Sequence, residues 1–271
     1  MPTFQNTTFA SFFKRILQFG HAGNNGTPTG TTNIQAGDGV ATSVSLSDDV
    51  LSVQPVNDDT TGTMLVKNNA GNNILAVDTD NSKVLLGASQ VPPTNYAHFG
   101  IHSGDGGWAG SSADTHYAVP FHTTSTVTTL VGMGSSTSSS FNDTNPATSL
   151  TVATNAENAV IMYWYVMDDI TIDAVKWFHG ADTATGEDTA AHLMAYTVDI
   201  ANGSTGGDLS SGVVVADGAN ITNAGYEQLY YQQMTIQSAD VDAGKVIMFT
   251  FASDTVNSDY SINATIKYHI R

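Results

Sequence analysis

The chain contains no cysteine. Disulfides, thiolate metal sites and cysteine nucleophiles are therefore excluded. Basic side chains are also scarce, because eight Lys and Arg stand against 25 Asp and Glu among 271 residues, giving a formal net charge of -17. A nucleic-acid groove needs clustered basic residues, so we expect no nucleic-acid partner. The excess of acid favours solubility.

Long apolar runs are absent as well. The longest, residues 159–167, is too short to span a bilayer. The first six residues lack the basic and apolar regions of a signal peptide. We therefore expect no membrane insertion. If the protein acts outside a cell, we expect it to leave by lysis, as virion proteins do.

Polar residues that favour strands and turns dominate what is present. Only 12% of the residues are charged, and much of the polarity comes from Thr, Ser, Asn, Asp and Gly. Turn signals separate eight or nine expected strands between residues 95 and 271, which predicts an all-β fold whose head is an antiparallel, jelly-roll-like β-sandwich. The expected strands are 117–121, 149–153, 159–166, 172–179, 192–198, 213–216, 226–236, 245–252 and 261–270.

The last two of these segments, 245–251 and 260–270, are predicted to pair as the closing strands of the head. In the second, the apolar side chains alternate with polar ones, so they are expected on one face of a strand. These apolar residues are Ile262, Ala264, Ile266, Tyr268 and Ile270.

Residues 74–87 separate the polar, repetitive start of the chain from the head. They predict a strand, a tight turn and a second strand: Ile74 to Asp78 alternate, Asp78 to Ser82 are turn formers, and Gly87 closes the second strand. Residues 40–90 carry short strands with few apolar side chains, so they need a partner to complete a core.

This stretch resembles the stem segments of trimeric bacteriophage tail fibres. The matching residues are Ala76, Val77, Asp78, Thr79, Asn81, Lys83, Val84, Leu86 and Gly87, and the one departure is Leu85 where such stems usually have Gly. The resemblance implies a thin three-fold stem over residues 40–90, a homotrimer, and a place on the virion surface.

Residues 1–20 are predicted to form an anchor helix, followed by a Gly/Thr/Asn linker over 21–39. The apolar stripe of this helix consists of Phe9, Phe12, Phe13, Ile16, Leu17 and Phe19. The helix could fold back on its own head, plug into a neighbouring subunit, or lie in a membrane interface with Lys14 and Arg15. We favour the plug, into a tail or capsid protein of the particle, because the linker separates the helix from any core of its own.

Several residues suggest chemistry, and each also has a structural interpretation. Carboxylates at Asp168, Asp169, Asp173, Glu187 and Asp188 suggest glycoside hydrolysis. However, Asp168 and Asp169 have the character of turn residues after a strand, and Glu187 and Asp188 lie in a Gly/Thr loop. Imidazoles at His98, His102, His116 and His122, near Asp105 and Asp114, suggest a metal site. Their spacing matches no known metal-binding motif. In a trimer, however, one His near the three-fold axis could form a site with the same His of the other two chains. We expect no catalytic residue, no cofactor and no metal.

Aromatic residues in the head are the candidate receptor contacts, because exposed aromatic rings stack on sugars and are enriched at interfaces. They are Trp108, Tyr226, Tyr230 and Tyr231. The predicted function is a phage virion fibre whose head binds a glycan or protein on the host surface. The alternatives are a capsid decoration or head fibre protein with a stabilising or weakly adhesive role, and a polysaccharide depolymerase.

Overall fold

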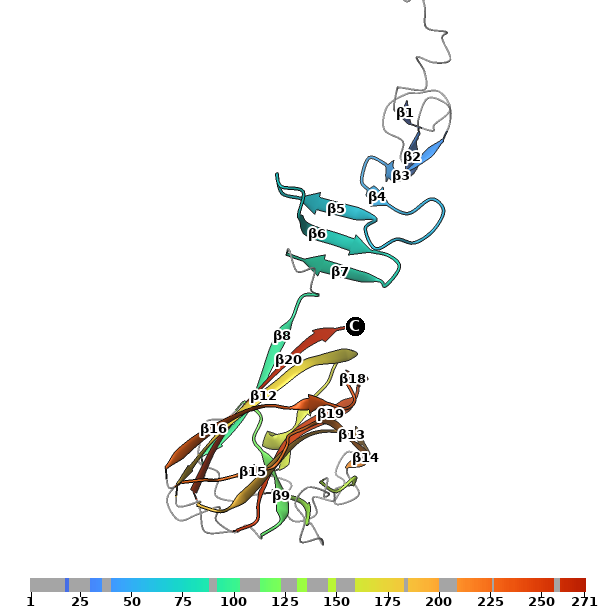
Figure 1. Ribbon diagram of the computed structural model, residues 1–271. Coiled ribbons are helices and arrows are strands. Elements are labelled where there is room, and N and C mark those ends of the chain that lie inside the picture. The colour runs from blue at the N-terminus through green and yellow to red at the C-terminus, as the bar shows by residue number, and fades with distance from the viewer. Residues whose placement is uncertain are drawn as a thin grey trace, which may run out of the picture. The chain divides into compact units, whose positions relative to one another are not determined.

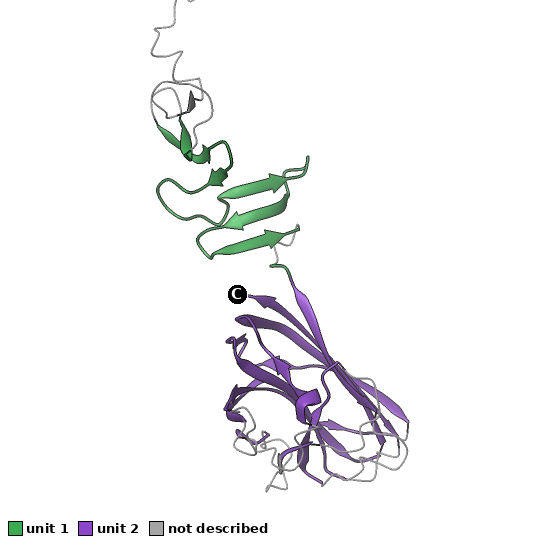
Figure 2. Ribbon diagram, turned by 180° about the vertical axis from the view of Figure 1, so that it is seen from behind, with its two compact units in different colours: residues 1–93 green, residues 94–271 purple. Residues whose placement is uncertain are grey.

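β-strands form every element of the described chain except one 3-10 turn, Val160–Met162 (Figure 1). The computed structural model describes residues 18–19, 30–35, 40–87, 92–102, 113–122, 131–135, 146–149, 159–182, 185–199, 209–225, 227–255 and 259–271. Within these ranges the strands pair antiparallel, as predicted for an all-β protein. The chain divides into two compact units, residues 1–93 and 94–271 (Figure 2).

The first unit begins with a four-stranded sheet. Its strands, in spatial order, are β1 (Gln18–Phe19), β2 (Thr32–Gln35), β3 (Ala41–Leu46) and β4 (Leu51–Val53). The predicted anchor helix is wrong at its described end, because Phe19 is in β1 and pairs with Ile34. A short helix gains little without packing, whereas strand pairing satisfies backbone groups directly. The other anchor residues, Phe9, Phe12, Phe13, Ile16 and Leu17, lie outside the described residues.

The predicted linker also contains ordered pairing, since β2 lies within residues 21–39 and is bonded to β3. The Thr and Ile side chains of this short segment suit a strand. The surrounding residues are mostly Gly, Asn and Thr, so the composition of the whole segment predicted a linker instead of a strand.

A three-stranded sheet completes the first unit. It consists of β5 (Met64–Lys67), β6 (Asn73–Asp78) and β7 (Lys83–Leu86), with β6 in the centre. The predicted strand, turn and strand over residues 74–87 are confirmed. Leu85 does not disturb the turn, because it pairs with Ala76 inside the sheet.

The second unit contains two antiparallel sheets. The first has five strands in the order β16 (Gln228–Gln233), β12 (Ile170–Asp182), β20 (Asp259–Ile270) and β8 (Asn95–His102), with β18 (Asp240–Val241) added to β12. The second has eight strands: β10 (Val131–Ser135), β9 (Thr115–Val119), β19 (Lys245–Ser253), β13 (Asp188–Val198), β14 (Leu209–Asp217) and β17 (Thr235–Ile236), with β11 (Trp164–Tyr165) on β19 and β15 (Ile221–Thr222) on β13.

One hydrophobic core lies between these two sheets. Trp177 on β12 is fully buried, and its ring centroid lies 6.1 Å from Phe249 and 5.9 Å from Phe251 on β19. On β20 the predicted alternation is confirmed for Ile262, Ala264 and Ile266, which enter the same core. The five-stranded sheet therefore packs against this core with one of its two faces.

The opposite face of the eight-stranded sheet carries a second apolar cluster. Met194, Tyr196 and Met248 are buried there against Met133 and Met162. Strands β13 and β19 are thus covered on both faces, which explains their nearly continuous apolar sequence.

One predicted strand pairing and two predicted strands differ from the structure. Residues 245–251 and 260–270 do not pair: β19 joins the eight-stranded sheet and β20 the five-stranded sheet. Segment 159–166 begins as the 3-10 turn and ends in β11, and segment 226–236 is interrupted at Met234 between β16 and β17.

Strand β8 was not predicted. Its residues Ala97, Phe99 and Ile101 alternate inward, but His and Gly separate them in the sequence. Segment 149–153 lies mostly outside the described residues.

Candidate binding surface

The aromatic residues predicted as receptor contacts do not form one group. Tyr230 and Tyr231 are neighbours in β16, so their side chains point to opposite faces. The Tyr230 ring stacks on buried His179, with centroids 4.9 Å apart, whereas Tyr231 is 53% exposed. Trp108 and Tyr226 lie outside the described residues. Of the predicted contacts, the structure therefore presents Tyr231 to solvent.

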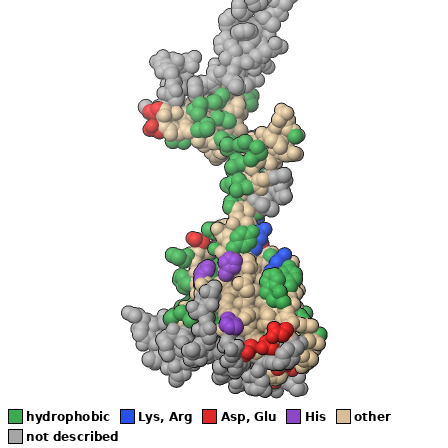
Figure 3. All heavy atoms as spheres, turned by 90° about the vertical axis from the view of Figure 1, so that its left-hand side faces the viewer, with side chains coloured by type: hydrophobic (Ala, Val, Ile, Leu, Met, Phe, Trp, Pro, Cys, Tyr) green, Lys and Arg blue, Asp and Glu red, His purple; other side chains and the backbone are tan. Residues whose placement is uncertain are grey.

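Tyr231 belongs to the solvent-facing side of the five-stranded sheet, which we call the outer face. Paired residues on neighbouring strands lie side by side, so this face consists of rungs across β16, β12, β20 and β8. The first rung is Gln233, Lys176, Thr265 and His98; the second is Tyr231, Phe178, Asn263 and Gly100; the third is Leu229, Gly180, Ser261 and His102. On one face of the second unit, basic, His and apolar side chains lie among small polar ones, and most of the acidic side chains in view gather toward its lower end (Figure 3).

An aromatic pair is the most exposed apolar feature of the second rung. Phe178 is 43% exposed, and its ring centroid lies 5.0 Å from that of Tyr231. The ammonium group of Lys176 lies 5.9 Å from the Tyr231 centroid, a distance at which a cation is attracted to the ring. Sequence reasoning missed Phe178 because its partner is distant in the chain and only the strand register joins them.

Small hydrogen-bonding side chains occupy the remainder of these rungs. His98 Nδ1 lies 3.2 Å from the Thr265 hydroxyl, and His102 Nδ1 lies 2.7 Å from the Ser261 hydroxyl. These contacts orient the two exposed imidazoles across the β8–β20 edge. The outer face thus combines the exposed pair of Phe178 and Tyr231, which we call the aromatic ledge, with small polar side chains.

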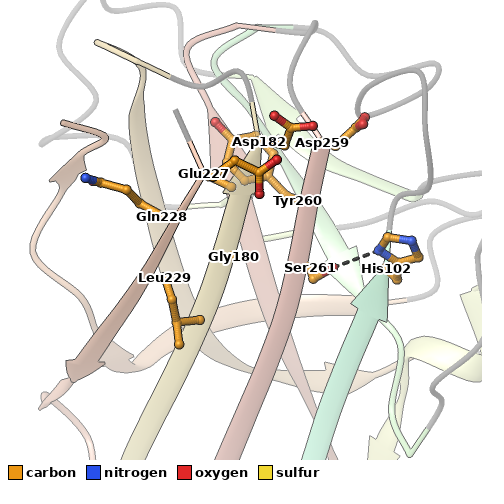
Figure 4. A pocket seen from close by; sticks show the side chains of 10 residues that line it. His102, Gly180, Asp182, Glu227, Gln228, Leu229, Asp259, Tyr260 and Ser261 are labelled. Atoms are coloured by element: carbon orange, nitrogen blue, oxygen red, sulfur yellow. Dashed lines mark hydrogen bonds between the residues drawn. The ribbon is translucent and has the colours of Figure 1, made fainter. Parts of the chain in front are cut away.

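The third rung borders a hollow of about 420 Å³ (Figure 4). Gly180 forms part of its lining, and no atom lies near the position that a Cβ would take there. Three carboxylate residues, Asp182, Glu227 and Asp259, line the hollow, and Asp182 pairs with Asp259 across two strands. This end of the outer face is therefore acidic.

The four histidines proposed as metal ligands are divided between the sheets. His98 and His102 are exposed on β8, and His122 is exposed after β9, whereas His116 is buried in the eight-stranded sheet. Asp105 lies outside the described residues. Among the residues that are described, no group of three His, Asp or Glu side chains could hold a metal ion.

Burial controls the protonation of two other histidines. Burial lowers the pKa of His179 to about 4, against the opposing effect of its 3.1 Å hydrogen bond with Asn223. Burial also lowers the pKa of His192, although Asp217, at 3.3 Å, opposes the shift. Both residues are therefore neutral parts of the packed interior at neutral pH.

Most of the carboxylates considered for hydrolysis have structural partners. Asp169 accepts a 2.8 Å hydrogen bond from the Ala243 amide, and Asp173 bonds His269 at 2.9 Å. Glu187 is buried and accepts from Tyr260, and Asp188 accepts from Thr222. Asp169 and Glu187 immediately precede β12 and β13, Asp188 begins β13, and Asp173 lies at an irregularity in the pairing of β12 with β20. Asp168 lies in the bend between β11 and β12.

The turn between β6 and β7, predicted as the stem turn, has a defined set of hydrogen bonds in the first unit. The two carboxylate oxygens of Asp78 accept from the backbone and side-chain amides of Asn81, each at 2.9 Å, and these bonds lower the pKa of Asp78. The Thr79 hydroxyl lies 2.7 Å from that of Thr63. Gly87 ends β7 with a φ of 70°, which favours glycine.

The β5–β6–β7 sheet exposes an unusual amount of apolar side chain. Its residues with large exposed apolar groups are Met64, Leu65, Val66, Ile74, Val84 and Leu86, each 40% to 51% exposed. Val66 and Leu65 are adjacent on one strand, so the exposure affects both faces of the sheet. Ala76 and Asp78 are buried on the central strand, but the large apolar side chains of the sheet are uncovered, so it lacks the core that independent stability requires.

Comparison with known proteins adds little. No family model matches the chain, and no curated protein resembles it in sequence. A chain of Desmodium yellow mottle tymovirus is similar in structure over 65% of this chain and 87% of that chain, with 10% identity and a TM-score of 0.22. A TM-score this low carries no argument about fold or function. Within the described residues, no helix has the length and apolar character needed to cross a membrane.

Proposed function

We propose that this protein is a surface fibre of a bacteriophage virion, in which the first unit is a trimeric stem and the second unit is a sandwich-like head that binds the host surface. The observation that carries the proposal is the apolar exposure on the β5–β6–β7 sheet. Six large apolar side chains of one small sheet face solvent in a single chain. Covering them is the simplest way to make the sheet stable.

Further copies of the same chain are the occupants that fit this surface best. Oligomers of identical chains are the common case, and each copy brings the same unmet apolar area. The resemblance of residues 74–87 to trimeric fibre stems favours three copies. Asp78, Thr79 and Asn81 hold the turn of each chain, which leaves the strands free to pack with their counterparts.

A trimeric stem would carry three heads on each fibre. Linking several weak sites in this way multiplies their combined affinity, provided that they reach the target together. The protein would therefore need only a modest site on each head to hold a host surface. Its N-terminal residues would attach it to a tail or capsid protein.

Two measurements test this function. Light scattering of the intact protein is expected to give three times the 28.4 kDa mass of one chain; a mass of one chain would overturn the trimeric stem. Immunogold labelling of particles with antibody against residues 94–271 is expected to mark the tail of a receptor-binding fibre. Label over the capsid would favour a head fibre or decoration protein instead, and unlabelled particles would contradict a virion role.

A depolymerase is the second candidate, because Asp182, Glu227 and Asp259 line one hollow. Glycosidases use pairs of carboxylates beside the bond that they cleave. Incubation of the purified protein with host polysaccharide distinguishes the two functions. New reducing ends that disappear in an Asp182→Asn variant would favour the enzyme, and none are expected from a binding head.

A further inference from the structure

We propose that the outer face of the second unit binds an acidic glycan, one whose sugars carry carboxylate groups, over the rungs that contain Lys176 and Lys267. This inference rests on the proposed function, because it identifies the chemistry by which the head would hold a host surface. It concerns β12, β16, β20 and β8, and it excludes the acidic hollow.

Charge is the first support for this ligand. In a chain with a net charge of -17, the second unit has only four Lys and Arg residues. Arg271 is held by Asp242 at 2.8 Å and Asp240 at 3.5 Å, and Lys245 donates to the Thr197 hydroxyl at 2.6 Å. Among the described residues, no carboxylate lies within ion-pair distance of Lys176 or Lys267. Both lysines therefore keep their charge available to an anion.

The placement of these lysines on one face is the second support. Lys176 pairs with Thr265, and Lys267, two residues further along β20, pairs with Tyr96. Side chains two residues apart in a strand point to the same side. Asp173, further along β12, has its carboxylate against His269 at 2.9 Å. The rungs of Lys176 and Phe178 contain no Asp or Glu, so the positive charge of Lys176 lies among neutral and His side chains.

The aromatic ledge is the third support, because it favours a sugar over a simple anion. Phe178 and Tyr231 present ring surface to solvent, and the apolar face of a sugar can stack on it. The Lys176 ammonium lies 5.9 Å from the Tyr231 ring centroid, so a carboxylate on a sugar stacked at this aromatic pair would lie close to a positive charge. The amide of Asn263 and the hydroxyl of Thr265 lie in the same rungs and match sugar hydroxyls.

The hollow sets one limit of the site. Asp182, Glu227 and Asp259 would repel a polyanion beyond the third rung. The chain of sugars would therefore lie on the Lys176 side of Gly180. A protein partner fits less well, because a stable protein interface needs a larger apolar centre than the small group of Phe178, Tyr231 and Leu229, which Lys, Gln and Asn side chains border.

The full-length protein and tetragalacturonate, an acidic tetrasaccharide, provide the test by titration calorimetry. The wild type is expected to bind tetragalacturonate, more weakly as ionic strength rises, and to bind the neutral maltotetraose at least about tenfold more weakly, because the charge contribution is lost. Phe178→Ala is expected to weaken binding about tenfold through loss of the ledge. Lys176→Gln and Lys267→Gln are each expected to weaken it by up to about fivefold.

Two control variants separate these effects from general damage. Val160→Ala shortens an exposed apolar side chain on the 3-10 turn, away from the outer face, and Lys67→Gln removes one positive charge from the first unit. Both are expected to bind as the wild type does. Equal affinity for the neutral sugar, no binding of either sugar, or unchanged affinity in Phe178→Ala and Lys176→Gln would each overturn the proposal.

Light scattering of the same samples distinguishes this inference from the proposed function. A trimer that fails to bind tetragalacturonate would contradict the acidic-glycan site and leave the fibre intact. A monomer that binds it would support the site and contradict the trimeric stem. A wild-type oligomer that dissociates in Phe178→Ala would show that copies of the chain cover the outer face, which also overturns the glycan site.

Discussion

The Tyr260 hydroxyl donates a 2.5 Å hydrogen bond to the Glu187 carboxylate, and both residues are buried. Tyr260 is on β20 of the five-stranded sheet, and Glu187 immediately precedes β13 of the eight-stranded sheet. Burial, with the bond to Glu187, raises the pKa of Tyr260 well above its usual range. This contact joins the two sheets through a polar pair beside their shared core.

Tyr260→Phe is expected to lower the free energy of unfolding by about 1–3 kcal/mol, because the buried Glu187 carboxylate loses a donor. Denaturation in urea, followed by tryptophan fluorescence, measures it; all three tryptophans (108, 164 and 177) lie in the second unit. Tyr165→Phe is the control, since Tyr165 is exposed and its variant should match the wild type. Equal stability of the Tyr260 variant and the control would contradict a role for the contact.

Acid is expected to destabilise the second unit through His179. Its pKa is about 4 in the folded protein against 6.5 as the ordinary value, so the unfolded chain binds more protons between these values and stability falls as the pH decreases. The expected loss is roughly 2 kcal/mol between about pH 7.5 and about pH 5. The lowered pKa of His192 acts in the same direction.

Comparison with His179→Gln tests the assignment, because a Gln amide can still donate to Asn223 but does not titrate. The free energy of unfolding of this variant should change less between the two pH values than that of the wild type. The same pH dependence in both proteins would mean that other groups cause it.

Leu86→Ser is expected to prevent trimer formation while leaving the second unit folded. Leu86 is 41% exposed in one chain, so its loss costs an isolated chain little, whereas a hydroxyl in the apolar interface of a trimer is unfavourable. Sedimentation equilibrium should show the mass of one chain for this variant. Lys83→Gln, an exposed polar change on the same strand, should remain a trimer; a trimeric Leu86 variant would argue against packing through β7.

Gly212→Ala is expected to destabilise the second unit by about 1–3 kcal/mol through overpacking. A Cβ at this position would lie 2.5 Å from Cε1 of the Tyr196 ring and 2.9 Å from the Thr148 backbone. Thermal unfolding of the variant would show a lower midpoint. Gly180→Ala, where no atom lies near the added Cβ, is the matched control and should behave as the wild type does.

The local alternation of side chains was accessible from sequence, and the partners of the strands were not. The alternation predicts that Ile262, Ala264 and Ile266 share one face of a strand, because a period of two follows from strand geometry, and the structure buries that face at these residues. The same reasoning paired 245–251 with 260–270 as neighbours in sequence, yet the chain changes sheets between them. The alternation of apolar and polar residues indicates which side chains share a face of a strand, but it does not indicate which other strand pairs with it.

The candidate site shows the same division. Tyr231 was predicted as an exposed aromatic, but Phe178 and Lys176 were not linked to it, because their proximity depends on the register of β12 with β16. Tyr230 was predicted with Tyr231, and the strand places it on the opposite face against His179. Tyr230 and Tyr231 are adjacent in sequence, but their side chains lie on opposite faces of the sheet. Phe178 and Tyr231 are far apart in sequence, but strand pairing brings them together.

The sequence by itself determined an all-β protein without thiol chemistry and with a turn at residues 78–82, because composition and short-range spacing control strand and turn formation. The tertiary structure alone decided the two-sheet arrangement of the second unit, the ledge of Phe178 and Tyr231, the Tyr260–Glu187 contact and the exposure of the β5–β6–β7 sheet. These features depend on contacts between residues far apart in the chain, and the pattern of any one segment does not encode its partner.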